Sequence, residues 1–521
     1  MASIPFRHAV KDPELFCVTW EQVPGKGAVE RQQEEILSNA EQAVASGRIH
    51  ALGVTDNPGG NPSLSVELLC AEMSRLGIEP VVHFACRDKN RNAIESLLYG
   101  LERCNARNLL VVSGDYPSPE GFCGTARPVF DLDPVHVVQL ISAMNTGLVD
   151  TSLGRDTRLT PTNFFAGVAV SPFKKTEAEL YGQYSKLLKK IKAGAQFAIT
   201  QIGFDPRKFH ELILWLRQRQ IHLPVLANLF VLTYASAKFM TAGNVPGAVI
   251  PPALLTELAR EREYPDKGMA ARLLRAARFY SIMKGLGYAG VHIGGHNLTC
   301  DMVVEIIQRG EELYPSWQDV LGACDYRCEG MFYYCFHHVP GGFLNSDAPV
   351  LRTPSAAPSW LYRILMVVHR LFFDPSHRPY RFMQRIAHRI DRSPRAASLF
   401  GRVEHLIKTL LFRCADCGDC ALPDTAYLCP MSECAKFQRN GPCGGSTDGW
   451  CEVYPRRRQC LWVRVYKRMP SVPIHQCVGA QKIVPPCDWR LWQTSSWLNY
   501  FLGRDHNSKM LSTNGTDRST G

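Results

Sequence analysis

Carboxylate and amide side chains stand where several short apolar runs in the N-terminal part of the sequence end. Glu21 ends the first such run, Asp115 the fourth and Gln201 the sixth. A buried carboxylic acid can donate a proton near neutral pH, and an ionised carboxylate can stabilise a cation, so this set suits acid–base chemistry on a polar substrate. For any single residue the alternative is a cap on the next helix, but the set as a whole indicates a site.

A second group of reactive side chains consists of cysteines near the C-terminus. The chain has 19 cysteines, and they are dense between Cys414 and Cys487. The first three have ferredoxin-like C-x2-C-x2-C spacing, and the fourth stands directly before a proline. Two sets of four thiolates would fit [4Fe–4S] clusters or zinc, with iron–sulfur favoured by the spacing and a structural zinc knot as the alternative. Cys477 is an alternative ligand, as is Cys487. The predicted metal ligands are Cys414, Cys417, Cys420, Cys429, Cys434, Cys443, Cys451 and Cys460.

The elements that must position the polar residues are eight apolar runs that alternate with longer segments of helical spacing. Strands that alternate with helices form a parallel sheet, and eight such units of this length predict a (β/α)8 TIM barrel. An open doubly wound sheet is the alternative, but no G-x-G-x-x-G motif follows the first run. Active sites of such barrels lie where the strands end, so the polar residues would share one face. The predicted strands are 16–23, 50–57, 79–86, 108–115, 164–172, 195–204, 223–231 and 288–295.

Length and composition predict a multidomain globular protein. The 521 residues are too many for one core, and 45% hydrophobic with 21% charged residues is ordinary for such proteins. The N-terminus has no apolar targeting segment, and no apolar run is long enough to span a membrane, so we expect a cytoplasmic protein. The predicted domains are a barrel over 1–315, a linker with helices over 316–400, a cysteine-rich metal domain over 401–495 and a disordered tail over 496–521.

The positive charge is concentrated in the C-terminal third. The chain carries a formal net charge of +11, and the surplus lies between Arg352 and Arg490. This surplus suits an acidic protein partner, with a solvated basic face as the alternative, and we expect no nucleic acid. Two basic amphipathic helices are predicted near 359–390, with their apolar face packed on a neighbouring domain and docking on a membrane surface as the alternative.

Four sequence strings resemble the methylenetetrahydrofolate reductase family, in its order and at about its spacing. They are VTWEQVPG, GVTDNPGG, the run from HFACRDKN to VVSGDYP, and KAGAQFAITQIGFD. The resemblance covers roughly residues 14–300. It implies flavin-dependent reduction of 5,10-methylenetetrahydrofolate to 5-methyltetrahydrofolate, with FAD as the cofactor and FMN as the alternative. A flavin is needed because no side chain carries hydride.

The resemblance also implies roles for individual residues. Glu21 matches the general acid, and we expect burial to raise its pKa so that it can protonate the folate. Asp115 matches the aspartate that lies beside the flavin and holds the pterin, and Gln201 matches a glutamine that contacts the folate and the electron donor. The residues that match flavin-binding positions are Thr55, His83, Ser113, Gly114, Asp115 and, near the phosphate, Lys190.

The electron-donor side departs from the family pattern. Ser171 stands near the place of the usual tyrosine, and Gln183 and Lys186 replace acidic and amide residues. The cysteine-rich segment, with its NGPCGGSTDGWCEV string, is similar to the C-terminal-type domain or small subunit of some bacterial methylenetetrahydrofolate reductases, which implies electron transfer to the flavin. The donor is therefore either NAD(P)H or a ferredoxin-like protein, and oligomer formation is left open.

Two other functions remain open from the sequence. The same scaffold could oxidise methyl-folate in a demethylation pathway, because sequence does not set the direction of a redox reaction. A non-catalytic adaptor for a corrinoid protein or an electron carrier, with a structural zinc knot, is the second alternative. The presence of Glu21, Asp115 and Gln201 favours an enzyme over the adaptor.

Overall fold

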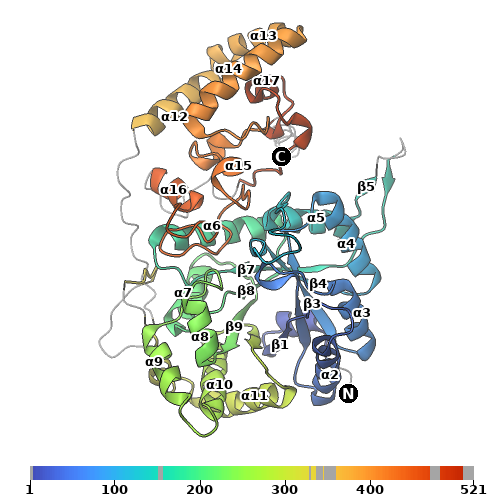
Figure 1. Cartoon of the computed structure of the whole chain (residues 1–521), viewed down its shortest axis with the longest axis vertical. Helices are drawn as coiled ribbons and strands as arrows, with labels where there is room; N and C mark the ends of the chain where they lie inside the picture. The colour runs from blue at the N-terminus through green and yellow to red at the C-terminus, as the bar shows by residue number, and fades with distance from the viewer. Residues whose placement is uncertain are drawn as a thin grey trace. The chain divides into compact units, whose positions relative to one another are not determined.

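The computed structural model describes residues 4–150, 156–327, 330–335, 344, 360–469 and 482–507. The chain divides into two compact units. The first comprises residues 1–351 together with the short segment Cys443–Asp448, and the second comprises 352–442 and 449–521. We describe each unit separately, and Figure 1 shows both.

The first unit contains a closed barrel of parallel strands, as the sequence predicts. Each predicted strand is present, and every pair of neighbours around the barrel is parallel, in the order β1-β10-β9-β8-β7-β4-β3-β2. An antiparallel hairpin of β5 (Val149–Asp150) and β6 (Thr157–Arg158), which the sequence analysis did not predict, lies outside the barrel. The barrel strands are β1 (Cys17–Gln22), β2 (Ala51–Thr55), β3 (Glu79–Ala85), β4 (Asn108–Val112), β7 (Phe165–Val170), β8 (Phe197–Thr200), β9 (Val225–Val231) and β10 (Gly290–Gly295).

Helices follow the strands and surround the barrel (Figure 1). Several begin at a side chain that accepts a backbone N–H, among them Asn90 before α4, Asp133 before α5 and Asp205 before α7. Neither Glu21, Asp115 nor Gln201 serves as such a cap, so the helix-cap alternative does not apply to them. The helices are α1 (Phe6–Lys11), α2 (Arg31–Ser46), α3 (Val66–Leu76), α4 (Arg91–Arg103), α5 (Pro134–Thr146), α6 (Glu177–Ala193), α7 (Pro206–Gln218), α8 (Tyr234–Thr241), α9 (Pro252–Glu261), α10 (Met269–Leu286) and α11 (Cys300–Leu313).

The apolar filling of the barrel lies toward the N-terminal ends of the strands. Helix α1 places Phe6 against the rings of Phe165 and Phe197, at 6.0 and 5.4 Å between ring centroids. Cys17, at the start of β1, belongs to the same buried cluster. Because hydrocarbon fills this end, polar groups at the carboxyl ends of the strands are left to form a site.

The second unit is helical and rich in loops. Its helices are α12 (Trp360–Phe372), α13 (Arg378–Asp391), α14 (Pro394–Phe412), α15 (Pro430–Glu433), α16 (Leu461–Arg468) and α17 (Ser496–Phe501). Helix α14 crosses the predicted boundary at residues 400 and 401. Phe501 of α17 packs against Phe373 and Tyr380, so the predicted disordered tail is wrong for residues 496–507. Residues 508–521 lie outside the described part of the chain.

Much of the apolar surface of α12 and α14 is exposed, and the predicted packing of the helices near 359–390 on a neighbouring domain stays a prediction. The exposed apolar residues recur at helical spacing, from Trp360 to Leu371 on α12 and from Leu399 to Leu410 on α14. No helix among the described residues is long and apolar enough to cross a membrane.

Candidate functional site

Glu21 lies at the carboxyl end of β1 beside a histidine of the neighbouring strand β10. The Oε2 atom of Glu21 is 3.4 Å from Nε2 of His292, and the other ring nitrogen of His292 is 2.8 Å from Oγ1 of Thr19. The His83 ring of β3 lies 5.1 Å from the His292 ring. Gly53 of β2 faces both, since a Cβ atom there would be 2.7 Å from Cε1 of His292 and 2.9 Å from Nε2 of His83. A glycine is therefore needed for the two histidines to approach.

The charge state of this group differs from the sequence-based expectation. Burial raises the pKa of Glu21, but the hydrogen bond and charge of His292, helped by His83, outweigh burial and lower it below its usual value. Burial lowers the pKa of His83 to about 4, and the neighbouring His292 acts in the same direction. Glu21 is thus ionised at neutral pH, and the expectation that burial raises its pKa was wrong because it overlooked His292.

Asp115 follows β4 and is fixed by neighbouring backbone. Its Oδ2 atom accepts a hydrogen bond of 2.9 Å from the backbone N–H of Gly59, which lies in the 3-10 turn after β2. The buried Arg87 side chain donates to the Asp115 carbonyl oxygen at 3.2 Å. Gly114 has a φ of +80°, and a Cβ there would lie 3.0 Å from Cβ of Arg87, so glycine suits the turn that presents Asp115. Glu21 and Asp115 therefore both lie at the carboxyl-terminal face of the barrel.

Gln201 follows β8 and has both ends of its amide engaged. Its Nε2 atom donates to the Pro246 carbonyl at 3.3 Å, and its Oε1 atom accepts from the backbone N–H of Ile202 at 2.8 Å. The loop between α8 and α9 thus holds the amide at the end of β8. Two other residues with predicted roles lie at strand ends: Thr55 donates to the Gln22 carbonyl at 3.5 Å, and Ser113 is buried.

Helix α6 brings two buried lysines to one place. Lys186 and Lys190 are 2% and 7% exposed, and Nζ of Lys190 donates to the Ala169 carbonyl at 2.6 Å. Burial, together with the charge of Lys186, lowers the pKa of Lys190 to about 7 despite the opposing charge of Asp133. Two buried lysine side chains on neighbouring turns of one helix suit the binding of a phosphate group.

Buried polar atoms provide a test of whether these residues fit a flavin. Within the described residues, Nε2 of His83, Oγ of Ser171 and Nε2 of Gln183 are buried and have no hydrogen-bond partner. Buried polar groups of this kind are rare unless a ligand or water satisfies them. His83 lies on β3 beside His292, whereas Ser171 follows β7 and Gln183 lies on α6, the helix that carries the two lysines. The residues therefore fit a cofactor with a polar ring edge and a phosphate.

Two residues within predicted strands, His292 and Asn228, received no role in the sequence-based prediction. His292 pairs with Glu21, and Asn228 is its register partner on β9. The Oδ1 atom of Asn228 is buried without a partner among the described residues. The available signal was a polar residue within an apolar run, LPVLANLFV for Asn228 and YAGVHIGG for His292.

Four predicted metal ligands line one cavity in the second unit. They are Cys414, Cys417, Cys420 and Cys429, and they share this cavity with Lys408, whose Nζ lies 3.4 Å from Sγ of Cys420. A hydrogen bond with the Cys487 thiol and burial raise the pKa of Cys417 well above its usual value. Five thiols thus meet here, and this donor set fits an iron–sulfur cluster or zinc, which would displace their protons.

The other four predicted ligands are divided between the two units. Burial, with the charges of Cys434 and Cys451, raises the pKa of the Cys460 thiol to about 12, so these three thiols lie close together. Cys443 begins the segment that belongs to the barrel unit. The predicted grouping of these four cysteines in one site stays a prediction.

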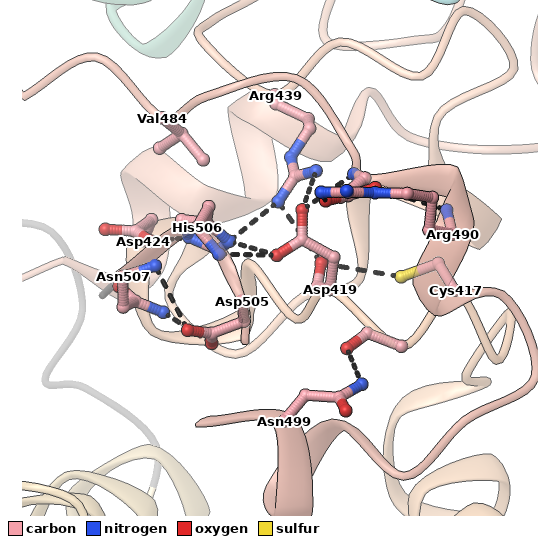
Figure 2. Close-up of polar contacts among 12 residues, drawn as sticks. Cys417, Asp419, Asp424, Arg439, Val484, Arg490, Asn499, Asp505, His506 and Asn507 are labelled. Atoms are coloured by element: carbon pink, nitrogen blue, oxygen red, sulfur yellow. Dashed lines mark hydrogen bonds and ion pairs between the residues drawn. The ribbon is translucent and has the colours of Figure 1, made fainter. Parts of the chain in front are cut away.

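A buried ion network holds the first cysteine loop in place (Figure 2). Asp419, between Cys417 and Cys420, accepts hydrogen bonds from Arg439 at 3.1 Å and from the His506 ring. These donors lower the pKa of Asp419 below its usual range, against the effect of burial. Asp419, Asp505 and His506 could also surround a metal ion, but the bound guanidinium indicates a structural network instead.

The fold and these residues define a (β/α)8 barrel whose polar groups gather at its carboxyl-terminal face, joined to a cysteine-rich unit. The sequence profile described as "Methylenetetrahydrofolate reductase" matches residues 7–306, which is more than half of the chain. The chain belongs to the methylenetetrahydrofolate reductase family, and its function is one of folate chemistry similar to that reductase. A second profile, described as "Methylene-tetrahydrofolate reductase C terminal", matches residues 393–490 and confirms the predicted fusion.

A comparison with solved structures gives one further similarity. A chain described as "Uncharacterized protein from Clostridium thermocellum binds two copies of 5-methyl-5,6,7,8-tetrahydrofolic acid" is 13% identical, with a TM-score of 0.41. The match covers 60% of the present chain and 99% of the other. Similarity at this level is too low for any conclusion about function.

Proposed function

We propose that the chain reduces 5,10-methylenetetrahydrofolate to 5-methyltetrahydrofolate with a bound flavin, FAD in the first instance. The observation that carries this proposal is that buried atoms of Ser171 and Gln183, near Lys186 and Lys190, have no hydrogen-bond partner among the described residues, in a barrel of this family. When bound, the flavin supplies the hydride that no side chain can provide. The lysine pair would hold its phosphate.

The residues of the chain would supply the proton and orient the folate. Glu21 lies 3.4 Å from His292, and its lowered pKa makes it an ionised carboxylate in the ligand-free protein. A folate ring that excludes water raises the pKa of Glu21, because desolvation disfavours the charged form of a carboxylate. Glu21 then carries the proton that opens the methylene bridge, and Asp115 holds the amidine edge of the pterin and stabilises the cation.

The cofactor proposal is tested by the colour of the protein. Purified under anoxia, the full chain should show flavin absorbance that bleaches on addition of 5-methyltetrahydrofolate, because the reverse half-reaction passes two electrons to the flavin. Tetrahydrofolate, which lacks the methyl group, is the control. A colourless protein, or a flavin that methyl-folate leaves oxidised, would favour the adaptor function instead.

We further propose that electrons enter through the cysteine-rich unit from an acidic, ferredoxin-like protein. The cavity with four lining cysteines and the basic charge of this part of the chain support the proposal. Anaerobic purification followed by metal analysis and electron paramagnetic resonance should find iron with reducible clusters. Zinc without iron would exclude an electron relay.

A further inference from the structure

The segment Cys443–Asp448 belongs to the barrel unit although the sequence around it belongs to the cysteine-rich unit. A buried lysine holds it there. Lys174, in the loop between β7 and α6, is 1% exposed, and its Nζ atom donates to the Ser446 carbonyl at 2.7 Å and to the Gly444 carbonyl. Hydrogen bonds from a charged donor are roughly twice as strong as neutral ones, and more so in a buried setting.

The segment also lies against the loop between α8 and α9. Gly247 has a φ of +80°, and a Cβ atom there would be 2.6 Å from the Gly444 carbonyl oxygen and 3.6 Å from Nε2 of Gln201. The two backbones therefore cross at the end of β8, where Gln201 stands. Since only glycine fits this crossing at position 247, the close approach depends on local sequence.

A third contact lies on α6. A Cβ atom on Gly444 would be 3.8 Å from Oε1 of Gln183, whose Nε2 atom is one of the partnerless buried groups. The segment thus lies beside the loop after β7, which carries Lys174, beside helix α6, and beside the loop between α8 and α9. Gln201, which follows β8, lies next to this crossing.

We infer that the segment Cys443–Asp448 sterically blocks one side of the barrel mouth. It thereby prevents a nicotinamide dinucleotide from approaching the proposed site of the flavin ring beside Gln201. Hydride transfer requires the donor ring within about 3–3.5 Å of the acceptor, so the donor needs open space across this mouth. The segment takes up that space with backbone held by Lys174. The inference rests on the proposed function for the ring site, and Lys174 is a positioning residue.

Two adjacent lysines provide a matched pair of variants. Lys174→Met removes the buried ammonium from two carbonyls. Lys175→Met removes a half-exposed ion pair with Asp448, at 3.2 Å, and such pairs contribute little. Hydrogen–deuterium exchange of the full-length holoprotein should show exchange of residues 443–448 rising about tenfold or more in Lys174→Met and staying within about twofold of wild type in Lys175→Met.

The second readout is reduction of the flavin by NADH and by NADPH in an anaerobic stopped-flow experiment. Both should leave the wild-type flavin oxidised, and the rate should rise by at least about tenfold in Lys174→Met. Gly247→Ala, whose methyl group would collide with the Gly444 carbonyl, should act in the same direction by a different change. Thermal melting identifies any variant that fails to fold.

Three results would contradict the inference that Cys443–Asp448 blocks the barrel mouth. They are rapid reduction of the wild-type flavin by a nicotinamide dinucleotide, unchanged exchange of residues 443–448 in Lys174→Met, and increased exchange without any gain in reduction. A protein without flavin contradicts the proposed function instead. In that case exchange still tests the anchoring by Lys174, and saturation-transfer NMR with NAD⁺ shows whether Lys174→Met gains dinucleotide binding.

Discussion

A single residue changes the electrostatics expected for the carboxylate on β1. Taken alone, a buried glutamate has a raised pKa and is a good acid. Glu21 has a lowered pKa because His292 lies 3.4 Å away, so its strength as an acid depends on this neighbour. Substrate binding, which removes water, would raise the pKa of Glu21 and favour the protonated acid.

Glu21→Gln tests this role. The amide keeps the shape of the side chain but cannot release a proton, so flavin content and reduction of the flavin by the donor should stay at wild-type levels. Folate turnover should fall by at least about 100-fold, within the usual contribution of a general acid. The exposed Glu34→Gln is the control. Turnover within about tenfold of wild type, a barrier change of only about 1.4 kcal/mol, would show that Glu21 is not the acid.

The lowered pKa of Lys190 predicts that flavin binding depends on pH. With its pKa lowered to about 7, the ligand-free protein has a charged Lys190 below that pH and a neutral one above it. A phosphate binds the charged form, so the flavin Kd should rise as pH increases from 7 to 9, by at most about tenfold per unit. Lys190→Met should weaken binding at pH 6 and remove this dependence. Titrations of apoprotein by fluorescence quenching measure both effects.

The control for this experiment is the exposed Lys192→Met on the same helix, which should keep the wild-type slope. A wild-type Kd that is flat between pH 6 and 9 would mean that Lys190 does not contact the phosphate.

At the scale of elements, strand β2 allows His83 and His292 to lie close together because its residue Gly53 has no side chain. Gly53→Ala would place a methyl group 2.7 Å from His292 and 2.9 Å from His83, so the rings must move apart. We expect a folded protein destabilised by about 1–3 kcal/mol, as for other overpacked cores, with folate turnover lost. Thermal denaturation and steady-state assays measure the two effects.

Gly100 on α4 is the matched control, because a Cβ atom there meets nothing within 4 Å. Gly100→Ala should keep full turnover and gain up to about 1 kcal/mol of stability, since alanine is the better helix former. Wild-type turnover in Gly53→Ala would show that the histidine spacing does not matter.

The helices and strands could largely be predicted from the sequence, whereas the contacts between distant residues could not. The eight strands were predictable because each is a short apolar run between helical segments, and strand-end residues such as Glu21 followed from the barrel topology. The effect of His292 on Glu21 could not be predicted, because it depends on the register between β1 and β10. The position of Cys443–Asp448 could not be predicted either. Its contact with Lys174 joins residues that are 270 positions apart in the sequence.

At the scale of the whole molecule, the two units differ in what stabilises them. The barrel has a continuous hydrocarbon core, with rings such as Phe6, Phe165 and Phe197 completely buried. The second unit has several small clusters, exposed apolar stripes on α12 and α14, and a fully buried aspartate, Asp419, between metal-ligand candidates. A small unit of this kind commonly depends on bound metal for its stability.

Cys420→Ser tests this dependence. Cys420 lines the cavity beside Lys408, so its loss should reduce the bound metal by the content of one site and lower the melting temperature of the second unit. The transition of the barrel and the flavin content should not change, because the core of the barrel contains no part of that cavity. Calorimetry and elemental analysis of the full chain measure these quantities, with the exposed Cys123→Ser as the control. Unchanged metal content would show that Cys420 is not a ligand, and a joint shift of both transitions would show that the two units unfold as one.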